Sequence, residues 1–401
     1  MIKRVNKGNI SLYLLLFLSF FSNATLRSED NLIIYMFISL FIFIWVYFRA
    51  LRQPKSIFAS FFTGFTAWLF VLFSIYFCYG LFLTSYDYFN ARYFLFILVS
   101  TYIIVVLFIR VPKDKIIDIF IKVCSVTIIA MSLFILLNEW SLIISGSTRI
   151  GESGSGNVNT VAIYLGTLSI PVLYKIIFEN KYIYIFPYAS SLVITLLTGS
   201  KKGIIFLLFG LILFLIMKYK IKAYKYLPYL LIMGIAVVFL FNNTYLYNII
   251  GYRIIDFLGT LGFNIEGANY SDSTAKRMLF IEMGYNFFIN NPIFGNGWGY
   301  FTSKIGTYSH NNFVELLVTY GLFGFVIYYS MFIYLLIKLI KMSSYDNDAK
   351  LFITIILTIL INDIAVVSFS YNVMNYQILA ITYIFANSSR QKSLGFKMGN
   401  G

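Results

Sequence analysis

Long apolar stretches follow one another along almost the whole chain, separated by short polar segments. Each has roughly the 20 residues that a helix needs to cross the hydrocarbon core of a bilayer. The pattern predicts an all-α polytopic membrane protein with about twelve transmembrane helices. We place them near residues 10–24, 32–48, 57–83, 91–109, 116–137, 158–178, 182–197, 203–217, 227–243, 313–337, 351–368 and 371–386. The first resembles a signal peptide, but further spans follow at once, so we expect it to stay uncleaved.

Composition supports this fold class. Hydrophobic residues make up 60% of the chain and charged residues only 12%, and the mean hydropathy is +0.81. A soluble domain carries roughly 25% charged residues. The two cysteines, Cys78 and Cys124, both fall inside apolar runs, so their spacing indicates neither a disulfide nor a metal site.

The net charge of +15 could indicate a nucleic-acid partner, but the distribution of the basic residues argues against one. With the N-terminus in the cytoplasm, the predicted spans place 21 of the 31 basic residues on the cytoplasmic side. This agrees with the positive-inside rule, and the opposite orientation would invert it. We therefore predict a multi-pass protein of the cytoplasmic membrane with both termini in the cytoplasm. Nine basic residues remain outside: Arg27, Arg92, Arg149, Lys201, Lys202, Arg253, Lys276, Arg277 and Lys304.

One outer, periplasmic loop, residues 244–312, is much longer than the others and lies within a single integral membrane domain, residues 1–401. It contains the turn-rich run 290–299, NNPIFGNGWG, and we expect short helices lying at the membrane surface there. No internal repeat is evident, which weakens an inverted-repeat transporter as an interpretation.

His310 is the only histidine in the chain and ends this loop just before an apolar span. At neutral pH an imidazole can take a proton from a hydroxyl group and release it afterwards. Glu315 follows within the same span and could orient the imidazole or stabilise its charge. Asn311 or Asn312 can cap the helix. The alternative is an interfacial histidine that only caps a helix end.

Several outer cations could bind an anion. Arg149 lies in the glycine-rich segment STRIGESGSGNVNT, and a guanidinium group suits phosphate. Lys201 and Lys202 interrupt an apolar stretch in a tight outer turn, where they could bind phosphate or simply be tolerated. Arg277 lies on a predicted amphipathic helix, and either Lys276 or Arg253 could substitute for it.

Three further features sit in or beside the spans. Asp363 lies near the outer end of the eleventh span, where it is a functional candidate or is merely exposed to water. Gly321 and Gly324 favour close helix packing. The run Asp346-Asn-Asp348 has the form of a metal–nucleotide motif, but it falls in a predicted cytoplasmic loop, and we interpret it as solvated.

Four segments in order along the chain resemble the family of bacterial O-antigen polymerases and O-antigen ligases. They are Arg149 with Asn157 and Asn159, the turn TGSKKG at 198–203, Arg277 followed by NNPIFGNGWGYF at 290–301, and SHNNFVELLVTYGLFG at 309–324. Lys201 stands where the family has an arginine. Val314 replaces a leucine and Thr319 occupies the later acidic position, although Glu315 is nearby.

The resemblance implies a helical bundle of the lipid-donor glycosyltransferase kind (GT-C-like), with its active site in an outer-face cavity. The donor would be an undecaprenyl-diphosphate-linked oligosaccharide. Arg149, Arg277, Lys201 and Lys202 would bind the diphosphate, and His310 would act as the base with Glu315, supported by Asn311 and Asn312. No cofactor, metal or nucleotide sugar is implied. Membrane lipid, a flippase and a chain-length regulator are the implied partners.

The resemblance leaves two reactions open. A polymerase joins one lipid-linked glycan to another, whereas a ligase transfers the finished glycan to the lipid A core. We favour the polymerase because the chain keeps the family pattern loosely. A lipid-linked oligosaccharide flippase is the alternative from another class, and it predicts ionisable residues at the middle of the membrane. Here few charged residues lie in the middle of a span, and the candidate site residues cluster in outer loops, which favours an enzyme.

Overall fold

The computed structural model describes residues 7–25, 41, 44, 48, 60–84, 89–109, 111–145, 149–155, 157–220, 272–370 and 372–388. Helices dominate these residues, and the one isolated β-bridge joins Thr84 to Trp298. The helices are α1 (Lys7–Thr25), α4 (Gly64–Phe82), α5 (Ala91–Phe108), α6 (Lys113–Asn138), α7 (Trp140–Ile144), α8 (Glu152–Ser155), α9 (Val158–Glu179), η2 (Tyr182–Tyr184), α10 (Ile185–Leu197), α11 (Lys201–Tyr219), α15 (Asp272–Asn290), α16 (Tyr300–Ile305), α17 (Asn312–Met342), α18 (Asp348–Asp363) and α19 (Val373–Asn387).

Six of these helices are long and apolar enough to cross a membrane, namely α4, α5, α6, α9, α17 and the part of α11 from Lys202. The spans predicted at 10–24, 182–197, 351–368 and 371–386 coincide with α1, α10, α18 and α19. Of these helices, α10, α18 and α19 are shorter than the roughly 20 residues that cross a membrane. The spans predicted at 32–48 and 227–243 lie almost wholly outside the described residues. Within the predicted loop 244–312, the described part holds the 19-residue α15 and the short α16.

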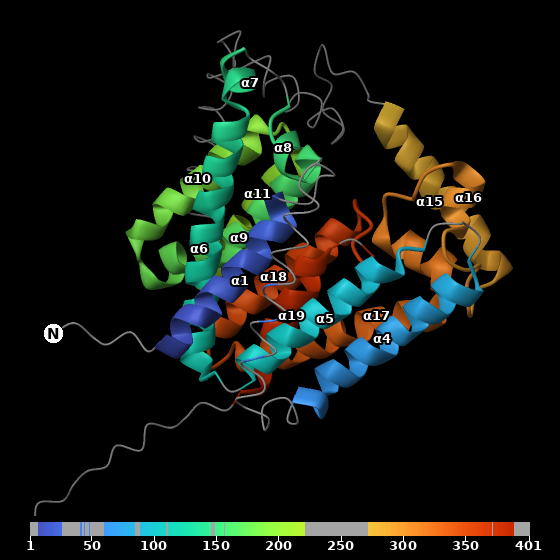
Figure 1. Cartoon of the computed structure of the whole chain (residues 1–401), viewed down its shortest axis with the longest axis horizontal. Helices are drawn as coiled ribbons and strands as arrows, with labels where there is room; N and C mark the ends of the chain where they lie inside the picture. Colours follow the sequence, from blue (N-terminus) through green and yellow to red (C-terminus); the bar gives the residue numbers. More distant parts are fainter. Residues whose placement is uncertain are drawn as a thin grey trace, which may run out of the picture.

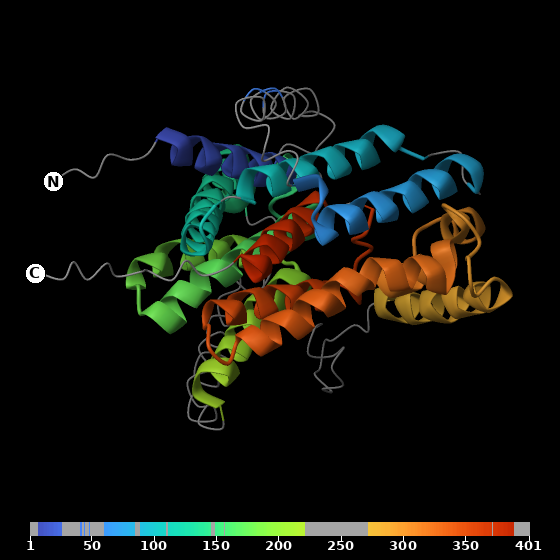
Figure 2. The ribbon, with the colours of Figure 1, turned by 90° about the horizontal axis from the view of Figure 1, so that it is seen from below.

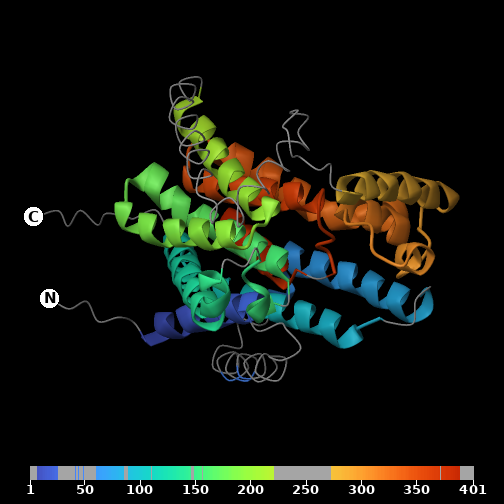
Figure 3. The ribbon, with the colours of Figure 1, turned by 90° about the horizontal axis from the view of Figure 1, so that it is seen from above.

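Two groups of helices flank α18 and α19 (Figures 1 and 3). On one side α9 packs against α6, α10 and α11, and on the other α17 packs against α4 and α15. Helices α4 and α5 run side by side, and α4 also packs against α17, as Figure 2 shows. Helix α19 contacts α5 and α17 on one side and α6 on the other, so it joins the two groups.

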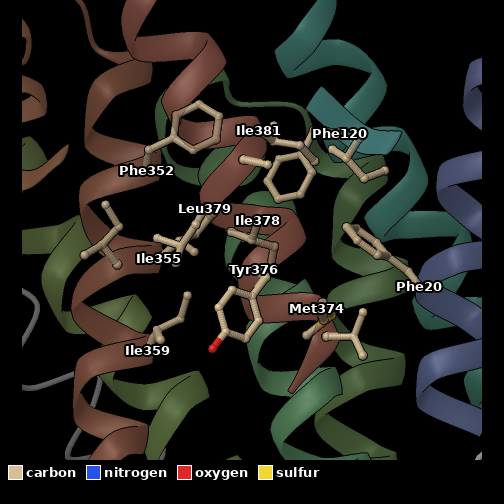
Figure 4. Packing of buried hydrophobic residues seen from close by; sticks show 14 of the residues in the cluster. Phe20, Phe120, Phe352, Ile355, Ile359, Met374, Tyr376, Ile378, Leu379 and Ile381 are labelled. Atoms are coloured by element: carbon tan, nitrogen blue, oxygen red, sulfur yellow. The ribbon is translucent and has the colours of Figure 1, made fainter. Parts of the chain in front are cut away.

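The core between the groups is built from aromatic and branched side chains (Figure 4). Phe120 of α6 stacks on Phe352 of α18 with ring centroids 6.0 Å apart, and Phe352 also meets Phe385 of α19 at 4.5 Å. Tyr376 of α19 is 1% exposed and lies within the same packed layer. Dispersion contacts of this kind hold helices together where lipid surrounds them.

The prediction that the run Asp346-Asn-Asp348 is solvated is wrong for Asp346, which is buried, whereas Asn347 is exposed and Asp348 is half-buried. The Asp346 carboxylate is 2% exposed and pairs with Lys113 Nζ at 2.9 Å. Asp348 begins α18, and its Oδ1 accepts a hydrogen bond from the Tyr174 hydroxyl at 2.6 Å. These bonds tie α6 and α9 to the start of α18, because a buried carboxylate needs nearby cations or donors.

We predict that Asp346→Asn destabilises the protein by roughly 3–5 kcal/mol, because it leaves the Lys113 ammonium buried without its partner. Thermal unfolding of the purified protein in detergent measures the effect. The control is Asp114→Asn, at the exposed residue next to Lys113 in α6. Its free energy of unfolding should stay within about 0.5 kcal/mol of the wild-type value. Equal unfolding temperatures for the two variants would contradict the buried ion pair.

Candidate functional site

His310 lies in the turn between α16 and α17, and its backbone is held in an unusual conformation. Its φ is +58°, a left-handed value that residues with a Cβ adopt at a cost of roughly 1–2 kcal/mol. The neighbouring hydrogen bonds maintain it. Ser309 N donates to Glu315 Oε2 at 2.8 Å, and Ser309 Oγ donates to the Asn311 carbonyl at 2.9 Å. Asn311 caps α17 by accepting from Val314 N at 3.1 Å.

Glu315 therefore contacts the backbone that precedes His310. It is 6% exposed, and its carboxylate accepts from Ser309 rather than reaching out to solvent. This bond orients the imidazole indirectly, by fixing the path of the chain that carries it. Strained backbone that its surroundings hold in place is typical of functional sites.

The imidazole of His310 is flanked by aromatic rings. Its centroid lies 4.1 Å from the ring of Tyr308 and 6.2 Å from that of Phe280, which stacks on it nearly parallel. Phe280 comes from α15, which approaches α17 closely because Gly284 leaves no side chain between them. A Cβ on Gly284 would lie 2.1 Å from Val314 Cγ1. Arg277 precedes Gly284 by two helical turns and shares its side of α15.

Burial and two nearby cations set the protonation of His310. Burial lowers its pKa to about 4, and the charges of Arg277 and Lys202 act in the same direction. At neutral pH the imidazole is therefore uncharged and has a free nitrogen lone pair. Burial also raises the pKa of the neighbouring Tyr308 hydroxyl, so it stays protonated.

Lys202 enters the site from the first turn of α11. Its Nζ donates a hydrogen bond to the Ala365 carbonyl, just after α18, at 2.7 Å. The side chain of Arg277 is exposed, and so is that of its neighbour Lys276. Lys201 begins α11, but only its backbone belongs to the described residues, and Arg253 lies outside them. The Lys202 ammonium is close enough to His310 for its charge to act on the imidazole.

A buried carboxylate that the sequence analysis missed holds the loop with Arg149. Glu139, at the end of α6, is 3% exposed and accepts from Gly151 N at 2.5 Å and from Ser153 N at 2.6 Å. Arg149 itself is exposed. The available signal was an acidic residue at the end of an apolar span, followed within about ten residues by a glycine-rich loop.

The Arg149 loop and the turn before α11 are in contact. Gly151 has a φ of +119°, and a Cβ built on it would lie 3.5 Å from Thr198 Cγ2. Ser200 Oγ donates to Asn159 Oδ1 at 2.9 Å, two residues after Asn157 caps α9. Two segments that are some 40 residues apart in the sequence thus form one structural unit next to Lys202.

The other two motif segments interlock through their backbones. Helix α17 breaks at Gly321, where φ is +62° and ψ is −164°. The run 290–299 fills the break. Asn296 N donates to the Val318 carbonyl at 2.7 Å, while Leu322 N donates to the Pro292 carbonyl at 2.9 Å. Each broken helical bond therefore finds a partner in the loop.

The backbones approach so closely that only glycine fits. A Cβ on Gly321 would lie 2.3 Å from the Ile293 carbonyl oxygen, and one on Gly295 would lie 2.5 Å from the Thr319 carbonyl oxygen. The loop continues to α4, since Trp298 N donates to the Leu83 carbonyl at 2.8 Å. Gly321 thus breaks its helix and receives a loop, whereas the sequence suggested close packing between helices.

Asp363 is fully buried, so the expectation that it is exposed to water is wrong. Asn312 Nδ2 donates to its Oδ2 at 3.2 Å, Tyr329 donates to the same oxygen at 3.0 Å, and Ser368 Oγ donates to Oδ1 at 2.5 Å. Asn312 Oδ1 in turn accepts from Ser368 N and Phe369 N. This network connects the His310 turn to the segment whose Ala365 carbonyl binds Lys202.

The charges of Arg277 and Lys202 thus act on His310, and the hydrogen bonds of Glu315, Asn311 and Asn312 fix the turn that carries it. The Arg149 loop touches the turn that precedes Lys202. Among the residues that the structure describes, no group of three or more His, Cys, Asp or Glu side chains could hold a metal ion. The arrangement can offer a neutral base next to cations that attract an anion.

The apolar helices and this site define a multi-pass membrane protein. A family model described as O-antigen ligase matches residues 186–329, so this part of the chain is similar to that family. The match confirms the resemblance that the motifs predicted, and it covers the segments 198–203, 290–301 and 309–324. Arg149 precedes it. A search of curated proteins finds no match.

We predict that Gly321→Ala destabilises the fold by more than about 3 kcal/mol, because the added methyl group meets the Ile293 carbonyl in a backbone region open only to glycine. Thermal unfolding in detergent measures it. Gly306→Ala is the matched control, since Gly306 also has a positive φ, of +81°, but nothing within 4 Å of its Cβ position. That variant should lose only about 1 kcal/mol. If both variants lose the same amount, the close approach is not what requires Gly321.

Proposed function

We propose that the protein is a glycosyltransferase that joins undecaprenyl-diphosphate-linked oligosaccharide repeat units, as an O-antigen or surface polysaccharide polymerase. The observation that carries the proposal is the strained turn that presents His310, whose pKa is lowered by burial and by the charges of Arg277 and Lys202. The family match supports an activity of the O-antigen polymerase or ligase kind. In the proposed orientation, the site faces the outer side of the cytoplasmic membrane and both termini are cytoplasmic.

In the proposed reaction, His310 removes the proton from an acceptor sugar hydroxyl as that oxygen attacks the anomeric carbon of the donor. The bond from this carbon to the diphosphate oxygen breaks, and undecaprenyl diphosphate leaves with the electron pair. Arg277 and Lys202 stabilise the negative charge that grows on the diphosphate. Arg149 adds a third cation from the adjoining loop, and Lys201 is proposed as a fourth.

Binding of the donor would also strengthen the base. The two cations that depress the pKa of His310 would be neutralised by the diphosphate, so the pKa would rise above its value of about 4. A base whose pKa approaches the working pH removes a proton more effectively. The imidazole is therefore a weak base in the empty site and a stronger one when the anionic donor is present.

Two alternatives remain in the proposal. The first is an O-antigen ligase, which would use the same cations and base to transfer glycan to the lipid A core. A flippase from another class would place ionisable residues along a path through the membrane. Asp363 is one such buried residue, but its carboxylate already accepts three hydrogen bonds within the protein, which suits a structural role. For the main proposal, we also infer a GT-C-like architecture and a chain-length regulator as a partner of the protein.

We predict that His310→Ala reduces polymer formation by roughly 10²–10⁴-fold, because it removes the general base. The variant is expressed in a strain deleted for the gene, its abundance in the membrane is confirmed, and the surface polysaccharide is separated on a gel. Lys276→Ala, at an exposed neighbour of Arg277, is the control and should restore the ladder. A full ladder from a normally inserted His310→Ala protein would show that His310 only shapes the helix end.

The deletion strain itself separates the two reactions. A single repeat unit on the lipid core indicates a lost polymerase. A bare core with lipid-linked polymer accumulating indicates a lost ligase, and would replace the polymerase in this proposal.

We predict that kcat/KM stays level from about pH 8 to pH 5 and falls below that with a midpoint near pH 4, where His310 becomes protonated in the free enzyme. Arg277→Met removes one of the cations that lower this pKa, so its midpoint should move up toward the ordinary histidine value of about 6.5. The assay uses purified enzyme and a lipid-linked oligosaccharide donor. Lys276→Met should keep the wild-type midpoint. Identical midpoints for the two variants would contradict an effect of the Arg277 charge on the pKa of His310.

A further inference from the structure

A groove lies between α1 and α10, well away from His310, and helix α6 forms its floor. Both flanking helices pack on α6, and the space enclosed is about 760 Å³. This is within the range of about 300–1,000 Å³ that small-molecule sites occupy. Its lining is almost entirely apolar and aromatic, and includes Tyr13, Phe17, Lys122, Val126, Tyr184 and Phe186.

The groove is open to the surroundings of the helices rather than sealed in the core. Val126 is 52% exposed and Phe186 is 65% exposed, although both line it. Helix α6 is one of the helices long and apolar enough to span a membrane, so its exposed apolar surface faces acyl chains. The shape and chemistry of the groove suit a single hydrocarbon chain.

A charged pair stands at one edge of this groove. Lys122 Nζ lies 2.8 Å from Asp118 Oδ2, and the two side chains are 52% and 45% exposed. The Tyr13 hydroxyl donates to the same aspartate oxygen at 3.1 Å. Because Asp118 is shared between a lysine and a tyrosine while half of each charged side chain stays exposed, the pair can still contact a polar group from outside.

The depth of Lys122 indicates what that polar group is. Helix α6 has 26 residues, which is about 39 Å, whereas the hydrocarbon core is about 30 Å thick. Lys122 follows the first residue, Lys113, by nine positions, or about 13 Å. With the hydrocarbon core centred on α6, the Lys122 Cα lies about 9 Å inside it, and the lysine stem extends from there toward the lipid phosphate.

The surrounding charge favours an anionic headgroup. Lys115 lies two helical turns before Lys122 on the same side of α6 and is exposed. Lys181, in the turn that leads into the groove from α9, pairs with Glu179 at 2.7 Å, and Lys175 pairs with the same carboxylate. Lysines thus outnumber carboxylates around this end of the groove, which attracts negatively charged lipid.

We propose that this groove is a binding site for an anionic phospholipid such as phosphatidylglycerol. One acyl chain lies between α1 and α10, and the phosphate lies beside Lys122. The lipid fills the space between two helices that are joined mainly through α6, and so fixes their spacing. The site is separate from the cations around His310, because Lys202 lies beyond the opposite end of α10 from the groove residues Tyr184 and Phe186.

Native mass spectrometry of the full-length protein in detergent tests this proposal, with phosphatidylglycerol and phosphatidylcholine of identical chains added in turn. Wild type should bind one phosphatidylglycerol about fivefold more tightly than phosphatidylcholine, the difference expected from one lysine near the phosphate. Lys122→Gln should abolish this preference. The charge control Lys341→Gln, at an exposed lysine of α17, should keep it.

A second variant tests the proposal by filling the groove with a larger side chain. Val126→Trp should lose both lipids, because the indole ring occupies the space of the acyl chain. Leu133→Trp, two turns further along α6 and also exposed, at 53%, should bind lipid as wild type does, which separates blocking from misfolding. Wild-type binding by Val126→Trp, or equal affinity of wild type for the two lipids, would overturn the proposal. Displacement of phosphatidylglycerol by undecaprenyl phosphate would also overturn it and assign the groove to the donor chain.

Discussion

The break in helix α17 is the constraint on which the arrangement of the site depends. In apolar surroundings, a helix can lose backbone hydrogen bonds only where other protein groups replace them. Here the replacement comes from the run 290–299, whose amides and carbonyls pair with those freed around Gly321. This interlock fixes the end of α15 against α17. It therefore also sets where Arg277 and Phe280 stand relative to His310 at the start of the same helix.

The chemistry of the site depends on two positive charges, those of Arg277 and Lys202, that act on the neutral imidazole of His310. Arg277 and Lys202 come from different helices, and within the part of the chain that the structure describes neither side chain forms a salt bridge with a carboxylate. Burial keeps His310 unprotonated and the two positive charges act in the same direction, and these charges also attract an anionic group. The same electrostatic arrangement thus accounts for both substrate attraction and base availability, with Lys202 held in place by a backbone carbonyl.

Buried carboxylates carry much of the tertiary organisation. Glu139 holds the Arg149 loop, Glu315 fixes the turn before His310, and Asp363 joins that turn to the connection after α18. All three carboxylates lie at or near the ends of apolar runs, where the sequence pattern alone predicts that polar residues are exposed to water. The structure instead turns each carboxylate inward onto amide, hydroxyl or side-chain donors, because an ionised group buried without such partners is costly.

The sequence by itself determined the helical class, the position of most spans and the four motif segments. Apolar runs of membrane-spanning length allow few other structures, and glycine, asparagine and proline signal turns locally. Asn311 was a foreseeable helix cap for the same reason. Only the tertiary structure decided that the charge of Lys202 acts on His310, that Glu315 acts through Ser309, and that Gly321 receives the loop from 290–299. Those choices depend on how helices far apart in the sequence rotate and approach one another, which local patterns do not encode.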